Sequence, residues 1–139
     1  MFWGYGFLYS KNDHYLGGFR ANKRHGTGIC VYNDGTRYEG GYKNGYICGS
    51  GKYVNEDDDC YEGDFMDDKY HGHGTYTYAY GAKYVGDFKN GEKSGKGTYY
   101  HTNGDQWQGG FINDGMHGKG LYTFANGKSK MSLYTKNKF

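Results

Sequence analysis

The chain has 139 residues, of which 27 are glycine and 18 are tyrosine, and its formal net charge is +2. Leucine, isoleucine, valine and phenylalanine total only 18 residues and proline is absent, which excludes both an aliphatic core and a collagen-like helix. An aromatic content of 20% with so little net charge argues against disorder, so we expect a folded chain with an aromatic core.

The opening residues 1–10, MFWGYGFLYS, are partly apolar but lack the basic start of a signal peptide and are interrupted by glycines. We therefore expect residues 1–14 to be folded, as the second half of a repeat. The sequence contains no run of about 18 apolar residues, so it predicts no membrane-spanning helix. The three cysteines, Cys30, Cys48 and Cys60, form no CxxC pair, and their odd number favours reduced thiols over a disulfide framework.

From residue 15 the sequence repeats every 23 residues with no insertion or deletion. An aromatic residue opens each copy, a glycine follows two residues later, another aromatic follows four residues later, and two further glycines come 11 and 13 residues after the first aromatic. The opening aromatics are Tyr15, Tyr38, Tyr61, Tyr84 and Trp107. We therefore divide the single array 1–139 into a partial repeat (1–14), five repeats (15–37, 38–60, 61–83, 84–106 and 107–129) and a degenerate closing strand with a tail (130–139).

The spacing of two within each copy is typical of β-strands. In the third copy Tyr61, Gly63 and Phe65 share one face, while Glu62 and Asp64 point to the other. Turn-forming pairs separate the two strands of a copy, and Asn-Gly and Asp-Gly pairs are strong hairpin signals. Those pairs are Asn44-Gly45, Asp67-Asp68, Asn90-Gly91 and Asn113-Asp114. Each copy is thus predicted to form one β-hairpin, and the chain of hairpins one long antiparallel sheet.

The recurring strand glycines require a physical reason, because glycine weakens an isolated strand. A flat Gly-x-Gly column, such as Gly72 and Gly74, leaves room for an aromatic ring of the neighbouring strand to lie on the backbone. We therefore expect the rings and glycines to form the core together.

The pattern Tyr-x-Gly-x-Phe…Gly-x-Gly-x-Tyr at 23 residues resembles the MORN (membrane occupation and recognition nexus) repeat. Residues 61–81 and 84–104 carry the resemblance most clearly, and it extends over essentially the whole chain. It implies an all-β, elongated, twisted, single-layer antiparallel sheet with a groove lined by the repeat aromatics. The roles attributed to the family are lipid contact, dimerisation and capture of partner helices, and its members include ciliary and cytoskeletal proteins.

We therefore expect a non-catalytic scaffold subunit that docks a partner segment, helical by preference, within a cytoskeletal or ciliary assembly of the cytoplasm or cell cortex. Tyrosine and tryptophan are favoured anchors at interfaces. The same rings could instead pack mainly on one another. The predicted groove residues are Tyr61, Phe65, Tyr76, Tyr78, Tyr84, Phe88, Tyr99, Trp107, Phe111 and Tyr122.

Charge is distributed in bands along the chain. Residues 56–92 carry a formal charge of −7, whereas the segments before and after carry +4 and +5. The acidic band could be solvated turns or a docking patch for a basic partner segment. Its predicted patch residues are Glu56, Asp57, Asp58, Asp59, Glu62, Asp64, Asp67 and Asp68.

Other kinds of site are not expected. No nucleophile motif, P-loop or Rossmann fingerprint occurs, so no enzyme activity and no cofactor are predicted. The histidines of the copies, His25, His71 and His117, fall on alternate repeats and cannot share a metal. The acidic band would interrupt nucleic-acid binding, which needs continuous positive potential.

Two further expectations concern partners. The alternative function is a peripheral membrane module that binds anionic phospholipid, favoured by a lysine-rich end. Its lysines are Lys128, Lys130, Lys136 and Lys138. Homodimerisation through the terminal strands is the other expectation, because the ends of the array expose sheet edges.

Overall fold

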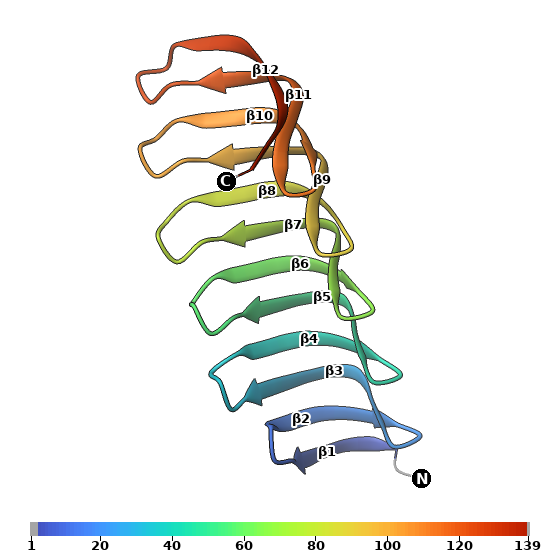
Figure 1. The fold of residues 1–139 in the computed structure, drawn as a ribbon. Helices are drawn as coiled ribbons and strands as arrows, with labels where there is room; N and C mark the ends of the chain where they lie inside the picture. Colours follow the sequence, from blue (N-terminus) through green and yellow to red (C-terminus); the bar gives the residue numbers. More distant parts are fainter. Residues whose placement is uncertain (1–2, 139) are drawn as a thin grey trace.

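The computed structural model describes residues 3–138, and the side chains of residues 3–134. They form one open antiparallel sheet of 12 strands in sequence order, with no helix in this part of the chain (Figure 1). This confirms the predicted all-β sheet of hairpins. The strands are β1 (Gly4–Tyr9), β2 (Asp13–Arg20), β3 (Lys23–Tyr32), β4 (Arg37–Lys43), β5 (Tyr46–Val54), β6 (Cys60–Met66), β7 (Lys69–Thr77), β8 (Lys83–Lys89), β9 (Glu92–Tyr100), β10 (Gln106–Ile112), β11 (Gly115–Thr123) and β12 (Ser129–Lys138).

Two-residue turns close the hairpins β2–β3, β4–β5, β6–β7, β8–β9 and β10–β11. Asp67 and Asp68 have φ angles of 48° and 70°, the positive pair that a type I′ turn requires. All four turn pairs predicted within the copies lie at these positions. The first hairpin turns at Ala21 and Asn22 (φ 52° and 66°), a pair that the sequence does not mark because alanine rarely adopts positive φ.

Consecutive hairpins are joined by five-residue turns of one design. After β7, the Gly81 N–H donates to the Tyr78 carbonyl (2.9 Å) and the Tyr78 N–H donates to the Ala82 carbonyl (2.8 Å). Glycine occupies the fourth position in four of the five turns that connect consecutive hairpins, with φ between 91° and 107°. In the remaining connecting turn, Asp58 occupies the fourth position and also has a positive φ, of 66°.

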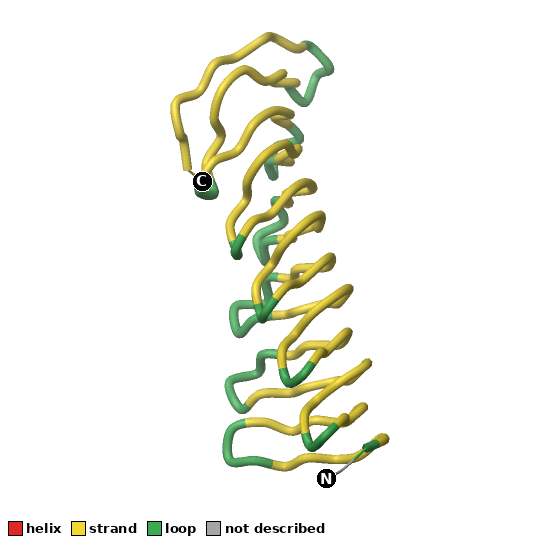
Figure 2. Tube along the Cα trace, turned by 90° about the vertical axis from the view of Figure 1, so that its right-hand side faces the viewer, coloured by secondary structure: helices red, strands yellow, loops and turns green. Residues whose placement is uncertain are grey.

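A bulge bends every hairpin at the same place. Gly63 pairs with Gly74 and Phe65 pairs with Tyr70, so a single residue of β6 faces three residues of β7. Gly72, among those three, has φ 76°. Bulges of this kind bend and twist a sheet, and Figure 2 shows strands that curve along the whole array. Gly72 therefore shapes the backbone, which corrects the expectation that it seats a ring as Gly74 does.

The core consists of rings seated on paired glycines. A Cβ atom at Gly74 would lie 2.4 Å from Tyr61 Oη, and one at Gly63 would lie 2.5 Å from the Gly74 Cα. The Tyr61 ring thus lies directly on this glycine pair, as predicted, and its hydroxyl donates to the Asp64 carbonyl at 2.7 Å. Tyr61 is 0% exposed. A single-layer sheet can bury a ring this completely only if the sheet bends around it.

Edge-to-face contacts link the rings of neighbouring repeats. The Tyr61 ring centre lies 5.0 Å from Phe65 in its own strand and 5.0 Å from Phe88 in the next repeat. Tyr134 of β12 makes the same kind of contact with Trp107, at 5.4 Å. We call the face that carries these rings the inner face. The outer face carries the alternate residues, such as Leu16, Glu62 and Val85.

Candidate functional site

Most of the aromatic residues predicted to line a groove are core residues. Seven of the ten are 0–5% exposed, and a partner could not reach them without opening the array. The seven are Tyr61, Phe65, Tyr84, Phe88, Tyr99, Trp107 and Phe111. The other three, Tyr76, Tyr78 and Tyr122, are half-buried and present part of their rings to solvent. The structure thus separates the predicted groove into a core and a smaller accessible part, and the binding role of these residues stays a prediction.

Two of these three, Tyr76 and Tyr78, belong to a row of five tyrosines on β5, β7 and the turn after β7, which we call the tyrosine ladder. Consecutive ring centres are 6.3, 5.9, 4.8 and 5.3 Å apart. In that order the members are Tyr53, Tyr70, Tyr76, Tyr78 and Tyr80. Four of them are half-buried and Tyr80 is 65% exposed, so the ladder offers a continuous aromatic surface in the middle of the array.

Packing underneath holds the ladder in place. The Tyr70 ring stacks on the buried Tyr61 ring, with centres 4.0 Å apart and planes 16° apart. Lys93 is 7% exposed, and its Nζ lies 5.1 Å from the centre of the Tyr78 ring and 3.9 Å from Asp114 Oδ1. Burial lowers the pKa of Lys93, and the Asp114 charge opposes that effect. A cation–π contact in such a sheltered place fixes the orientation of the Tyr78 ring.

Burial raises the pKa of four ladder members, Tyr53, Tyr70, Tyr76 and Tyr78, so their hydroxyls are uncharged at neutral pH. Burial, followed by the nearby charge of Tyr53, raises the pKa of Tyr70 to about 12. Burial also raises the pKa of Tyr76, and a hydrogen bond to Asp59 adds to the rise. Rings with neutral hydroxyls combine apolar faces with polar tips, a combination common at protein interfaces.

The eight acidic residues do not gather at a single place. Glu56, Asp57, Asp58 and Asp59 occupy the turn between β5 and β6, whereas Asp67 and Asp68 lie at the opposite end of β6, in the hairpin turn. The strand between the two groups has seven residues, which is roughly 20 Å. Glu62 and Asp64 lie between them on the outer face and are exposed.

Two of these acids hold the backbone together. Asp59 Oδ1 accepts from the Ala79 N–H at 2.8 Å, and its Oδ2 accepts from Tyr76 Oη at 2.9 Å. Asp68 Oδ1 accepts from the Ile47 N–H at 2.7 Å. The first of these links joins the acidic turn directly to the turn that carries Tyr78 and Tyr80. An exposed acidic segment, formed by residues 56–58, therefore lies beside the ladder.

A basic hollow lies on the outer face of β7 to β11. It has a volume of about 710 Å³, and backbone of the strand glycines forms its floor. Two histidines and two lysines line it: His73, Lys96, His117 and Lys119. His73 Nδ1 lies 3.7 Å from Asp87 Oδ1, so one acid partly offsets this positive charge.

Reactive clusters are absent from the part of the chain that the structure describes. No group of three or more His, Cys, Asp or Glu side chains is arranged to hold a metal ion there. Cys30, Cys48 and Cys60 are free thiols in the structure. Burial raises the pKa of Cys30, which keeps its thiol protonated at neutral pH. No helix long and apolar enough to cross a membrane occurs in residues 3–138.

Three members of the ladder are missing from the residues predicted from sequence: Tyr53, Tyr70 and Tyr80. Tyr70 falls in a column that holds arginine, isoleucine, lysine and methionine in the other copies, so no shared residue type marks it. The signal that could have identified Tyr70 is the strand spacing of two, because counting back in steps of two from Tyr76 and Gly74 reaches residue 70. Tyr80 lies in a turn, where sequence periodicity says nothing about the face.

Comparison with known proteins identifies the repeats. The model of the MORN repeat matches residues 15–37, 38–60, 61–82, 84–106 and 107–129. Among curated proteins, no match to the chain is significant.

Proposed function

This chain is a MORN repeat protein, and we propose that it is a non-catalytic scaffold subunit that docks a helical partner segment on the tyrosine ladder. The observation that carries the proposal is the ladder itself: five adjoining rings that remain accessible, whereas the rings on which they pack, such as Tyr61 and Tyr84, are fully buried. Aromatic residues that are held rigidly and half exposed are the usual anchors of protein interfaces.

The spacing of the ladder supports a helix as the occupant. Its rings are 4.8–6.3 Å apart, close to the 5.4 Å rise of one helical turn. An amphipathic helix laid along the ladder would place about one apolar side chain per turn against each ring. The ladder is at most about 20 Å long, which corresponds to about four helical turns and is much shorter than the sheet.

Charge beside the ladder supports a partner segment that carries basic residues. Residues 56–58 form an exposed acidic turn, and the turn is tied through Asp59 to Ala79, next to Tyr80. A helix with basic residues would meet this turn while its apolar side covers the rings. Complementary charge at a rim sets the register and the association rate more than the affinity.

The test is affinity capture from cells that make the protein, followed by mass spectrometry. The ladder variant is Tyr78→Ala with Tyr80→Ala. The matched control is Tyr46→Ala, because Tyr46 is 53% exposed but precedes the buried Ile47 and therefore points to the outer face, away from the ladder. We expect one stoichiometric protein that the wild type and the control retain and the ladder variant loses.

A second variant separates loss of contact from loss of folding. Glu56→Lys with Asp57→Lys changes two exposed turn residues, should leave the melting temperature nearly unchanged, and should slow association in a salt-dependent way. A partner that binds the ladder variant as well as it binds the wild type would contradict the proposal. We place the assembly in the cytoskeleton, at a cilium or the cell cortex, by analogy with the family, and imaging of the tagged chain tests that location.

Contact with anionic phospholipid is the second candidate, and the basic hollow favours it. Lys96 and Lys119 lie on the outer face, so a membrane would use the side opposite the ladder. In the lysine-rich end, the side chains of Lys136 and Lys138 lie outside the described residues. Flotation with phosphatidylserine vesicles at low salt, lost in Lys96→Glu with Lys119→Glu, would support it, and absence of flotation would end it.

A further inference from the structure

The two free edges of the sheet differ in chemistry. Residues 3–10, which include β1, contain no charged side chain. On the outer face of β1, Tyr5, Phe7 and Tyr9 are 68%, 63% and 68% exposed. At the other edge, β12 carries Lys130, and Lys128 precedes it. Lysines on an edge strand hinder pairing with another chain, and an uncharged aromatic edge lacks that protection.

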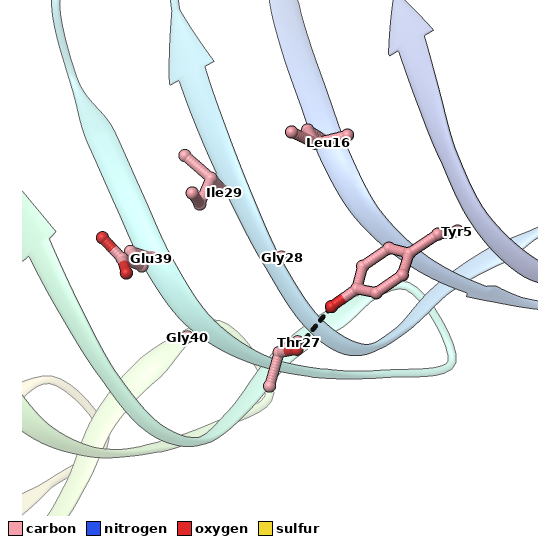
Figure 3. Close-up of a pocket in the computed structure, with 7 residues that line it drawn as sticks. All are labelled: Tyr5, Leu16, Thr27, Gly28, Ile29, Glu39 and Gly40. Atoms are coloured by element: carbon pink, nitrogen blue, oxygen red, sulfur yellow. Dashed lines mark hydrogen bonds between the residues drawn. The ribbon is translucent and has the colours of Figure 1, made fainter.

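The aromatic row of β1 is ordered and continuous with an apolar surface. The Tyr5 ring reaches across Gly18 of β2, and its hydroxyl lies 3.1 Å from Thr27 Oγ1 of β3, as Figure 3 shows. Leu16 and Ile29 line the same outer-face hollow of about 550 Å³, whose single charged lining residue is Glu39. Phe7 and Tyr9 stack at 5.4 Å with planes 9° apart. These rings are therefore presented in fixed positions at an unpaired strand.

We propose that β1 pairs with β1 of a second copy, antiparallel about a twofold axis through Phe7, so that the two arrays form one continuous sheet. The sequence around Phe7 is self-complementary in this register. Tyr5 lies opposite the partner's Tyr9, and Phe7 lies opposite the partner's Phe7. On the inner face, the small Gly6 lies opposite the partner's Leu8. A twofold axis perpendicular to the sheet keeps outer face beside outer face, as an isologous contact requires.

The expected interface is small. Taking about 200 Å² for each aromatic residue, the exposed parts of Tyr5, Phe7 and Tyr9 amount to roughly 400 Å² per copy before any backbone is counted. That is about half the area per partner of a standard interface, so the dimer should be reversible and concentration-dependent. Cross-strand aromatic pairs and the newly paired edge hydrogen bonds stabilise it. This contact leaves the tyrosine ladder accessible and is independent of the docking proposal.

The first test is sedimentation velocity of the full chain from about 1 to 200 μM, a range that spans the micromolar affinities expected of a weak interface. We expect a monomer–dimer equilibrium. Phe7→Lys places two lysines opposite each other and should raise the dimer dissociation constant about tenfold or more. The matched control is Leu133→Lys on β12, where Leu133 is 74% exposed, and it should dimerise like the wild type. Circular dichroism checks that both variants remain folded.

Three outcomes would overturn the proposal: a wild type that stays monomeric throughout this range, loss of the dimer in Leu133→Lys, or a growing series of oligomers. The last would indicate head-to-tail pairing of β1 with β12.

The register has its own test. Under mild oxidation Phe7→Cys should cross-link to itself, since directly opposite residues lie about 4.5–5.5 Å apart at Cα, within disulfide range. Leu16→Cys lies beside Phe7 but one strand further from the axis, and it should not cross-link. The wild-type chain reports any background from its native cysteines. Cross-linking of Leu16→Cys as readily as Phe7→Cys would contradict the register.

Discussion

The packing of rings on glycine pairs leads to a sharp prediction for Gly74→Ala. The added Cβ would lie 2.4 Å from Tyr61 Oη and 2.5 Å from its Cε1 and Cζ atoms, and the backbone fixes the position of this methyl group, so the alanine cannot avoid the contact. The Tyr61 ring must move, although it is fully buried and in contact with the rings of Phe65, Tyr70 and Phe88. Partial displacement corresponds to overpacking, at about 1–3 kcal/mol, and full expulsion corresponds to loss of a core ring, at about 3–5 kcal/mol. We expect a loss of about 3 kcal/mol in the free energy of unfolding.

A double-mutant cycle with Tyr61→Leu tests the cause. Leucine keeps an apolar side chain at position 61 but lacks the distal ring atoms that the new methyl group would meet. In that background Gly74→Ala should cost less than about 1 kcal/mol, because alanine suits a strand better than glycine once the space is free. The coupling energy should therefore reach about 2 kcal/mol, well above the additivity error of roughly 0.5 kcal/mol.

The assay is urea unfolding followed by circular dichroism for the four proteins of the cycle. Equal losses from Gly74→Ala in the two backgrounds would mean that the glycine serves the backbone and not the ring, and the reasoning about the core would fail. An unchanged unfolding curve for Gly74→Ala alone would refute it equally.

Three further predictions concern the turns, the bulges and the tyrosine hydroxyls. Asp58→Gly should raise the free energy of unfolding by about 0.5–1 kcal/mol, because Asp58 holds φ 66° where the other four connecting turns have glycine; a urea midpoint that falls would contradict this. Gly49→Ala should lower it by about 1–2 kcal/mol although no atom lies within 4 Å of the new Cβ, because φ is 82°; a tolerated alanine would show that the bulge needs no left-handed residue. Burial is the main cause of a raised pKa in twelve tyrosines. Their contribution to the free energy of unfolding is therefore fully present below about pH 10 and is lost as the pH rises toward 12 and beyond. The loss is up to about 1.4 kcal/mol per pH unit for each tyrosine. Phenolate absorbance should then appear together with loss of circular dichroism, and gradual titration of an intact sheet would contradict the burial.

The fold could be predicted because each local signal agrees with the next. Turn pairs such as Asn90-Gly91 fix where strands reverse, and the spacing of two fixes which residues share a face. Repetition five times removes the ambiguity that a single hairpin would leave. The packing of an aromatic ring on the backbone at Gly74 could also be predicted, because only a residue without a side chain leaves room for the ring there.

The bulge and the resulting bend could not be predicted. Gly72 and Gly74 are the same residue type two positions apart, yet one adopts positive φ and the other accepts a ring. A sheet without the bend would leave every inner ring half exposed. The bend buries rings such as Trp107 and Phe111, and so it decides which aromatics a partner can reach.

The candidate site could be predicted in kind and only partly in its members. Tyr76 and Tyr78 belong to a column of aromatics and were identifiable from it. Tyr70 stands alone in its column, and Tyr80 lies in a turn. The acidic residues all fall within residues 56–68, but most of them lie at the two ends of β6, because a strand of seven residues separates the two groups.

Oxidative footprinting of the free chain and of the assembly recovered from cells tests the central claim most directly. One experiment compares the protection of three surfaces on assembly: the tyrosine ladder, the basic hollow and the aromatic row of β1. The account predicts that Tyr70, Tyr78 and Tyr80 lose reactivity in the assembly while Tyr46 does not. Unchanged reactivity of the ladder, with protection only at the hollow or at β1, would contradict it.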